Sequence, residues 1–223
     1  MVDLIRGLSA HTVASNLARA REAIAAAGRD PAEVEILAAV KYLPAEELTA
    51  LADGGVTIAG ENRAQELAAK AAAVPGRFTW DFIGQLQSRK VKDLLPLVRY
   101  IHSVASDSAL AQLERHGGPD TEVLIEVNVA GEPGKSGIAP EDLPAFLDRC
   151  PVRVVGLMTM PPFASDPEES RPYFALLRRL AERHELRHLS MGTSQDYVVA
   201  AQEGATIVRL GSTLFEPSGP SAS

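Results

Sequence analysis

Eight short apolar or β-branched runs alternate with helical patterns along this chain, and the alternation constrains its fold more than any other feature. Strands that alternate with helices pair in parallel through right-handed crossovers, and eight such strands can close into a barrel. The apolar runs predict strands at residues 34–40, 56–59, 78–83, 100–104, 122–129, 152–158, 189–191 and 206–210. Helical patterns lie between them, at residues 44–53, 62–73, 85–98, 107–115, 140–149, 167–184 and 195–203.

We therefore expect one α/β domain over residues 1–216, a (β/α)₈ barrel of the TIM type with an extra N-terminal helix at residues 12–27. The alternative is an open doubly wound sheet. A dinucleotide-binding fold of that kind needs a glycine-rich fingerprint after its first strand, and this sequence has none there. The tail at residues 217–223 is rich in Pro, Gly and Ser, which predicts disorder.

The composition narrows the kinds of partner. A formal net charge of −7 argues against nucleic acid, since proteins that bind a phosphate backbone usually present a basic face. No apolar stretch approaches the length of about 18 residues that a membrane span needs. The single Cys150 excludes an internal disulfide, and the N-terminus has no signal-peptide pattern. We expect a cytoplasmic monomer that binds a small molecule.

Two adjacent loops near the C-terminus have the composition of a phosphate site. The seventh predicted strand runs into "SMGTSQD", with Gly192 and Ser194, and the eighth runs into "VRLGST", with Gly211 and Ser212. Barrels commonly bind phosphate at these two loops, where small residues let backbone N–H groups approach an anion. One such loop alone is more often a simple turn from strand into helix. Two neighbouring loops favour a phosphate site.

Lys41 ends the first predicted strand, and strand one lies beside strand eight in a closed barrel. The chain has only five Lys against 17 Arg, so a lysine at this strand end is unlikely to be incidental. A lysine in a dry pocket can lose its proton and attack a carbonyl, which an arginine cannot do. The position of Lys41 beside the two loops therefore predicts a Schiff base between this lysine and a phosphorylated aldehyde. Without the two loops, a lysine reaching into solvent from a strand end would be the default interpretation.

Eight motifs, in order and with compatible spacing, resemble the pyridoxal phosphate homeostasis proteins of the YggS/PROSC family. The resemblance covers about residues 10–215. The motifs are "AVKY", "GENR", "DFIGQLQSRK", "HSV", "GEPGKSG", "GLMTMPP", "LSMGTSQD" and "VRLGSTLF".

The resemblance implies a barrel like the N-terminal domain of alanine racemase, with pyridoxal 5′-phosphate (PLP) held as an aldimine on Lys41. It assigns the phosphate to Ser194, Gly211 and Ser212, the pyridine nitrogen to Arg209, and the ring pocket to Asn62 and Met191. Three residues depart from the family pattern: Thr193 replaces a more usual methionine, Asp81 a frequent histidine and Glu216 a frequent glycine.

Two further motifs match known sites only in part. "HELRH" has the zinc-protease pattern, but a helix must end near His184 for the next strand to begin, so the spacing is not helical throughout. "GEPGKSG" resembles a nucleotide P-loop, but Val129 occupies the position of its first glycine. Lys135 in that loop is either a solvated lysine or a second PLP contact. We interpret His11, His102, His116 and Cys150 as structural.

Two functions follow. The first is a PLP-binding protein without turnover of its own that takes part in vitamin B6 and amino-acid homeostasis, with PLP-dependent apoenzymes as recipients. The second is a racemase or lyase that uses the same lysine. A racemase of this type carries a further β-domain and a tyrosine base from its dimer partner, and the length of 223 residues favours the first function.

Overall fold

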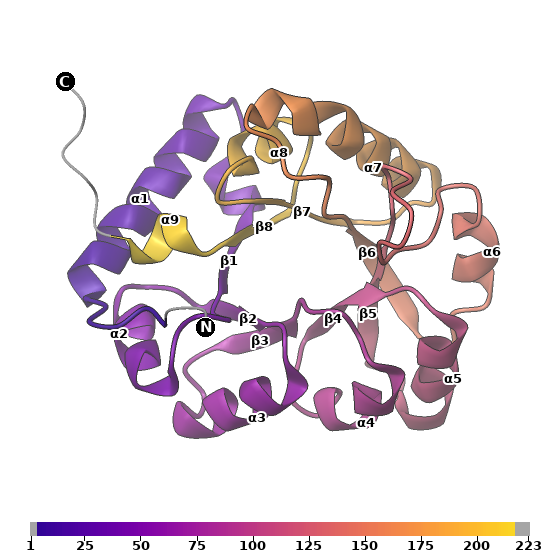
Figure 1. The fold of residues 1–223 in the computed structure, drawn as a ribbon, viewed down its shortest axis with the longest axis horizontal. Coiled ribbons are helices and arrows are strands. Elements are labelled where there is room, and N and C mark those ends of the chain that lie inside the picture. Colours follow the sequence, from indigo (N-terminus) through magenta and orange to yellow (C-terminus); the bar gives the residue numbers. More distant parts are fainter. Residues whose placement is uncertain (1–3, 217–223) are drawn as a thin grey trace.

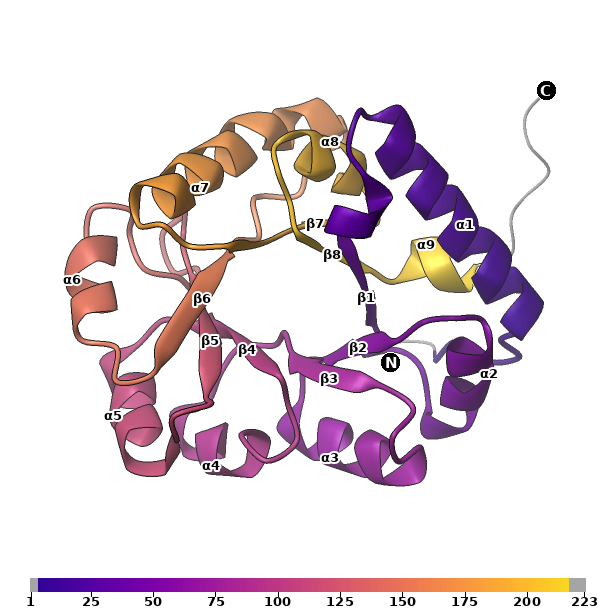
Figure 2. The ribbon, with the colours of Figure 1, turned by 180° about the vertical axis from the view of Figure 1, so that it is seen from behind.

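The computed structural model describes residues 4–216, and its eight parallel strands form one closed ring in chain order, as Figures 1 and 2 show. Each strand pairs with the next, and β1 pairs with β8. The predicted (β/α)₈ barrel is thus confirmed. The strands are β1 (Glu35–Ala39), β2 (Ile58–Glu61), β3 (Thr79–Phe82), β4 (Tyr100–Val104), β5 (Glu122–Glu126), β6 (Arg153–Met158), β7 (His188–Thr193) and β8 (Ile207–Leu210).

Helices surround the ring of strands on its outside (Figure 1). The α-helices are α1 (Ala10–Ala26), α2 (Leu48–Asp53), α3 (Ala64–Ala73), α4 (Val91–Leu94), α5 (Asp107–His116), α6 (Leu143–Asp148), α7 (Arg171–Arg183), α8 (Tyr197–Gln202) and α9 (Ser212–Phe215). Short 3₁₀ turns precede β1 and three of the helices, at η1 (Pro31–Glu33), η2 (Ala45–Glu47), η3 (Ser88–Lys90) and η4 (Pro167–Ser170).

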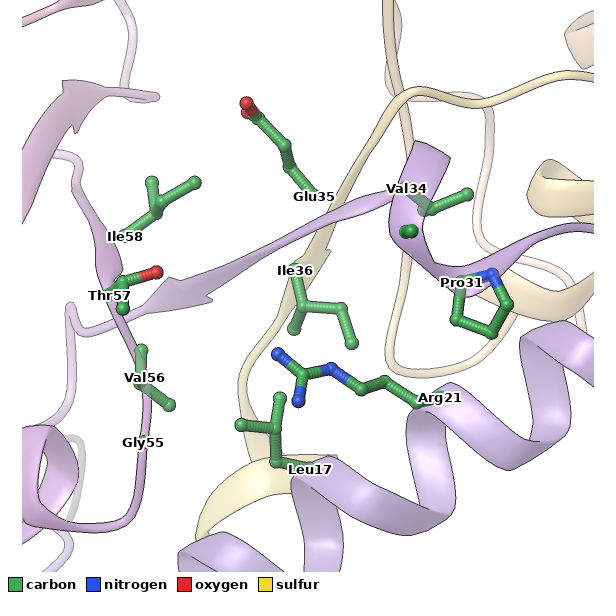
Figure 3. A pocket seen from close by; sticks show the side chains of 11 residues that line it. Leu17, Arg21, Pro31, Val34, Glu35, Ile36, Gly55, Val56, Thr57 and Ile58 are labelled. Carbon is green, nitrogen blue, oxygen red and sulfur yellow. The ribbon is translucent and has the colours of Figure 1, made fainter.

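Side chains alternate between the barrel interior and the helices, because successive residues of a strand point to opposite faces. Figure 3 shows this on β1, where Glu35 and Ile36 project to opposite sides and Ile36 faces Leu17 and Arg21 of α1. The result is two apolar layers, a large one between strands and helices and a small one inside the barrel. The inner cluster consists of Leu37, Tyr100, Leu124, Val155, Met158 and Ile207.

The helix predicted at residues 85–98 is much shorter in the structure. Residues 85–87 are not helical, and the segment that follows consists of the turn η3 and the four-residue helix α4. Pro96 has no N–H to donate to the carbonyl four residues earlier, so the hydrogen-bond ladder cannot continue through it. The helical pattern was correct in position and too long at both ends.

The extra N-terminal helix ties the two ends of the barrel domain together. The Nδ2 of Asn16 in α1, which is buried, donates to the backbone oxygen of Leu214 at 3.0 Å and to that of Glu216 at 2.9 Å. These bonds hold α9, and with it the end of β8, against α1. The tail predicted at residues 217–223 lies outside the described residues, and the domain limit at residue 216 stays a prediction.

Within residues 4–216 the structure has no helix that is both long and apolar enough to cross a membrane.

Candidate functional site

Lys41 lies just beyond the carboxyl end of β1 and is exposed. The alternation along β1 puts Leu37 inside the barrel, and Lys41 lies in the turn that follows the strand, at the mouth end of the barrel. Its Nζ lies 4.8 Å from the ring centroid of the neighbouring Tyr42, a cation–π distance. Lys41 is therefore an accessible amine at the end of the barrel where such folds place their chemistry.

A buried ion pair fixes the backbone from which Lys41 projects. The Nζ of Lys70, a residue of α3 that is only 4% exposed, donates to Glu61 Oε2 at 2.6 Å and to the backbone oxygen of Val40 at 2.7 Å. Glu61 Oε1 accepts the backbone N–H of Asn62 at 2.8 Å. The ends of β1 and β2 are thus joined beside Lys41. Sequence reasoning missed this pair, and its only signal was a lysine three residues after the buried Leu67 of the same helix.

The two loops predicted to hold phosphate converge on one side-chain oxygen. The Oγ of Ser194, after β7, accepts the backbone N–H of Gly211 at 3.1 Å and that of Thr213 at 3.3 Å, both after β8. Thr213 Oγ1 also donates to the backbone oxygen of Ser194 at 3.4 Å. Two N–H groups aimed at one oxygen are what an anion-binding loop requires, because an anionic oxygen can take the place of the hydroxyl.

The glycines of these loops have different roles. Gly192 has φ +90°, and a Cβ there would lie 2.5 Å from the Cβ of Ala200, so α8 packs directly on this glycine. A Cβ on Gly211 would meet only the backbone oxygen of Ala39, at an ordinary 3.8 Å. Gly192 therefore serves the packing of its loop, whereas Gly211 leaves open space beside the end of β1. Ser212 is exposed and begins α9.

Register connects these loops with the lysine. Leu210, the last residue of β8, pairs with Ala38 of β1. Gly211 and Lys41 therefore leave the sheet from neighbouring strands at the same end of the barrel. The proximity of loop and amine that the sequence predicted follows from the closed ring.

Arg209 points into the barrel and is 5% exposed. Its Nη1 donates to the backbone oxygen of Ser190 at 2.7 Å and to Ser190 Oγ at 2.6 Å, and its Nη2 donates to the backbone oxygen of Thr159 at 2.9 Å. Burial lowers the pKa of Arg209 to about 10, against the opposing charges of Asp196 and Glu126. The guanidinium thus stays protonated at neutral pH, as a fixed donor.

Asn62 and Met191 were both assigned to a ring pocket by resemblance, and the structure places them differently. Asn62 follows β2 at the mouth, where its backbone packs so closely on Gly84 that a Cβ on that glycine would lie 2.1 Å from the Asn62 oxygen. Met191 is fully buried with the helix-facing core, while its neighbour Ser190 faces the interior. The assignment of Met191 to the ring pocket stays a prediction.

The departures from the family pattern are accommodated locally. The backbone N–H and the hydroxyl of Thr193 both donate to Asp196 Oδ1, at 2.7 and 3.1 Å, which closes the loop after β7. Glu216 is exposed and its backbone oxygen receives the Asn16 bond described above. Asp81 is fully buried in the barrel.

The partial motifs do not form the sites that they resemble. His184 caps the end of α7 and His188 begins β7, so the two histidines of "HELRH" do not share a helix. Across residues 4–216 no cluster of His, Cys, Asp or Glu is suited to a metal ion. In "GEPGKSG" the hydroxyl of Ser136 donates to Glu126 Oε2 at 2.8 Å, and Lys135 pairs with Glu132.

A pocket of about 440 Å³ lies at the other end of the barrel, between α1 and the starts of β1 and β2. Arg21 and Glu35 line it together with apolar side chains (Figure 3). Because chemistry in this fold gathers at the carboxyl ends of the strands, we do not assign the pocket to the site of Lys41.

Comparison with known proteins agrees with this geometry. The family described as the alanine racemase N-terminal domain matches residues 8–218. The fold is thus that of the alanine racemase N-terminal domain. The pyridoxal phosphate homeostasis protein of Aquifex aeolicus is 40% identical over 213 residues, which cover 89% of this chain and 93% of the relative. That of Pseudomonas aeruginosa is 39% identical over 216 residues, 92% and 94% of the two chains.

Among solved structures, PipY of Synechococcus elongatus with PLP bound is 30% identical, with a TM-score of 0.77 over 91% of this chain and 99% of that one. The chain belongs to the family of the pyridoxal phosphate homeostasis proteins.

Proposed function

We propose that this chain binds PLP at the barrel mouth and takes part in PLP and amino-acid homeostasis. The observation that carries the proposal is the convergence of the Gly211 and Thr213 N–H groups on Ser194 Oγ, one strand away from Lys41. A phosphate group fits the converging N–H groups, and an aldehyde fits the amine of Lys41. The names of the relatives and the PLP in PipY support the same ligand.

In this proposal Lys41 binds the aldehyde of PLP, and the loops after β7 and β8 bind its phosphate. Lys41 would hold PLP through its amine nitrogen at the aldehyde carbon, with the aldehyde oxygen released as one water. Ser194, Gly211 and Ser212 hold the phosphate, Gly192 shapes the loop, Arg209 donates toward the pyridine nitrogen, and Asn62 borders the ring. PLP itself supplies an electron-withdrawing ring.

The homeostatic role consists of holding and releasing PLP, with PLP-dependent apoenzymes as recipients and amino acids as possible competitors for the aldehyde. We propose that the protein acts as a monomer in the cytoplasm, without partners among nucleic acids or membranes. Its net charge of −7 supports a recipient that presents no polyanionic surface.

Loss of the phosphate contacts should weaken PLP binding more than loss of the lysine. We expect Ser194→Ala to raise the dissociation constant at least about tenfold, because a charge-assisted hydrogen bond contributes about 1.5–3 kcal/mol. Gly211→Val keeps its backbone N–H, and we expect a similar loss because its side chain would occupy the open space in which the phosphate is proposed to lie. Lys41→Ala should cost less, since the imine forms reversibly. The measurement is equilibrium titration of the ligand-free variants with PLP, followed by absorption.

The space around Gly211 makes its variant a clean test, because a Cβ there meets nothing closer than 3.8 Å. Ser108→Ala is the matched control for Ser194→Ala, since Ser108 lies on the outer helix α5 and its hydroxyl pairs with that of Ser106. Wild-type affinity in both loop variants would show that phosphate binds elsewhere and would refute the proposed site.

The catalytic alternative predicts exchange at Cα of an amino acid, and we expect almost none. Arg209 is a protonated donor at neutral pH, so a pyridine nitrogen that it faces stays unprotonated and withdraws electrons poorly from Cα. The measurement is deuterium exchange at Cα of L-alanine in D₂O with PLP-loaded protein and with Lys41→Ala. Rapid exchange with inversion that depends on Lys41 would establish the racemase alternative.

A further inference from the structure

A chain of buried polar side chains crosses the barrel interior and ends on Arg209. Ser190 Oγ, which accepts from Arg209 Nη1 at 2.6 Å, lies 2.9 Å from His102 Nδ1. His102 Nε2 lies 3.1 Å from Asp81 Oδ2. Ser190 is on β7 and His102 is on β4, on opposite sides of the ring in Figures 1 and 2. We call Asp81, His102 and Ser190 the cross-barrel chain.

The direction of each hydrogen bond in the cross-barrel chain follows from which groups can donate and which can accept. Arg209 has only donors, so Ser190 Oγ must accept from it and can direct its own proton to His102 Nδ1. Nδ1 is then an acceptor, and the ring proton lies on Nε2, from which it is donated to the carboxylate of Asp81. Each side chain in the chain is satisfied when His102 is neutral with its proton on Nε2.

Arg99 holds the Asp81 end of the cross-barrel chain. Arg99 donates to both oxygens of Asp81, through Nε at 3.1 Å and Nη2 at 2.7 Å, and pairs with Glu35 at 2.8 Å. Burial opposes ionisation of Asp81, but hydrogen bonds from His102 and Arg99 hold its pKa below the usual value. Burial also lowers the pKa of His102, against the pull of Asp81. A carboxylate next to a neutral imidazole agrees with the order of donors above.

The four side chains from Asp81 to Arg209 are too deeply buried for water to replace a lost bond. Asp81 and His102 are fully buried, Ser190 is also fully buried, and Arg209 is 5% exposed. Removal of one side chain therefore leaves the polar group of its neighbour without a hydrogen-bond partner in a medium of low dielectric constant. The free-energy cost is high, and neighbouring side chains change orientation to reduce it. Arg209 lies at one end of these hydrogen bonds, and its Nη2 also donates to the backbone oxygen of Thr159, just beyond the carboxyl end of β6.

We propose that Asp81, His102 and Ser190 are positioning residues that hold the Arg209 guanidinium in the orientation in which it meets its ligand. The inference rests on the proposed function in taking PLP as that ligand. It gives a role to Asp81, which departs from the family pattern: an acceptor-only carboxylate selects the tautomer of His102, and His102 in turn orients Ser190 toward Arg209. The sequence had predicted only a structural role for His102.

The first test needs no ligand. In protein labelled with ¹⁵N in its histidines, two-dimensional NMR should show His102 at neutral pH as the neutral tautomer protonated on Nε2, assigned by the loss of its signals in His102→Gln. A proton on Nδ1, or a doubly protonated ring, would refute the hydrogen-bond order and with it the proposal.

The second test measures PLP binding in Ser190→Ala beside Ser103→Ala. Both serines are buried, but Ser103 is bonded to the backbone oxygen of Gly84 and takes no part in the chain. We expect Ser190→Ala to bind PLP about tenfold more weakly and to shift the absorption maximum of the bound ligand, in line with the loss of a supporting hydrogen bond at metal sites. Ser103→Ala should match the wild type in both readouts.

The outcomes separate the two proposals. If the wild-type protein binds PLP and Ser190→Ala behaves as Ser103→Ala does, the positioning role is refuted and the proposed function stands. If the wild-type protein takes up no PLP, the proposed function fails, and with it the ligand that Arg209 was inferred to meet. The NMR result then still decides the order of hydrogen bonds.

Discussion

Lys41→Ala should abolish covalent attachment of PLP while leaving part of the non-covalent binding intact. After borohydride reduction of wild-type protein loaded with PLP, peptide mapping should find the pyridoxyl label on the peptide that contains Lys41. The physical reason is access: Lys41 is an exposed amine beside the Gly211 loop, whereas Lys70 is buried in an ion pair. We expect essentially complete loss of the label in Lys41→Ala.

The matched control for this variant is Lys135→Ala. Lys135 lies in the loop after β5 and pairs with Glu132, so it is the other lysine with a claim to the ligand. Labelling should persist in Lys135→Ala at the wild-type level. A label found on Lys135 in the wild-type protein, and lost only in Lys135→Ala, would contradict the assignment of Lys41.

Lys70→Met should destabilise the protein by about 3–5 kcal/mol, because it leaves the buried carboxylate of Glu61 without its charged partner. The 2.7 Å bond to the backbone oxygen of Val40 is lost as well. Methionine has a similar volume, so the effect reports the charge and not a cavity. The free energy of unfolding is measured by urea denaturation followed by circular dichroism.

Two comparisons sharpen this prediction. Lys90→Met removes an ion pair with Asp93 whose side chains are 26% and 47% exposed, and exposed pairs contribute only about 0–1 kcal/mol. The double variant Lys70→Met with Glu61→Gln should recover part of the loss, because it leaves no unpaired buried charge. A loss below about 1 kcal/mol in Lys70→Met would show that Glu61 finds another partner or becomes protonated.

The strand pattern and the loops were predictable because their signals are local. The apolar runs gave all eight strands in position, since a buried strand needs consecutive apolar residues whatever surrounds it. Gly192 lies near the end of β7, not in the loop after it, and its φ of +90° is one that favours glycine. The helix predicted at residues 85–98 was too long at its C-terminal end because the periodicity was read through Pro96.

The face on which each residue lies was harder to predict. The sequence shows that Ser190 and Met191 are neighbours in a strand, but a shift of one residue exchanges the two faces. The pairing of Ser190 with Ile207, a residue of the inner cluster, fixes this choice in β7, and it turns Ser190 inward and Met191 toward the helices. Resemblance alone had placed Met191 at the ring.

The sequence by itself determined the number and order of strands, the lysine at the end of the first, and the small residues after the last two. These depend on the chemistry of residues close together in the chain. Only the tertiary structure decided that Lys70 reaches Val40, and that His102 meets Ser190 across a separation of 88 residues. Such contacts exist only once the ring has closed in one register, because closure brings β4 and β7 to opposite walls of an interior narrow enough for one imidazole to span.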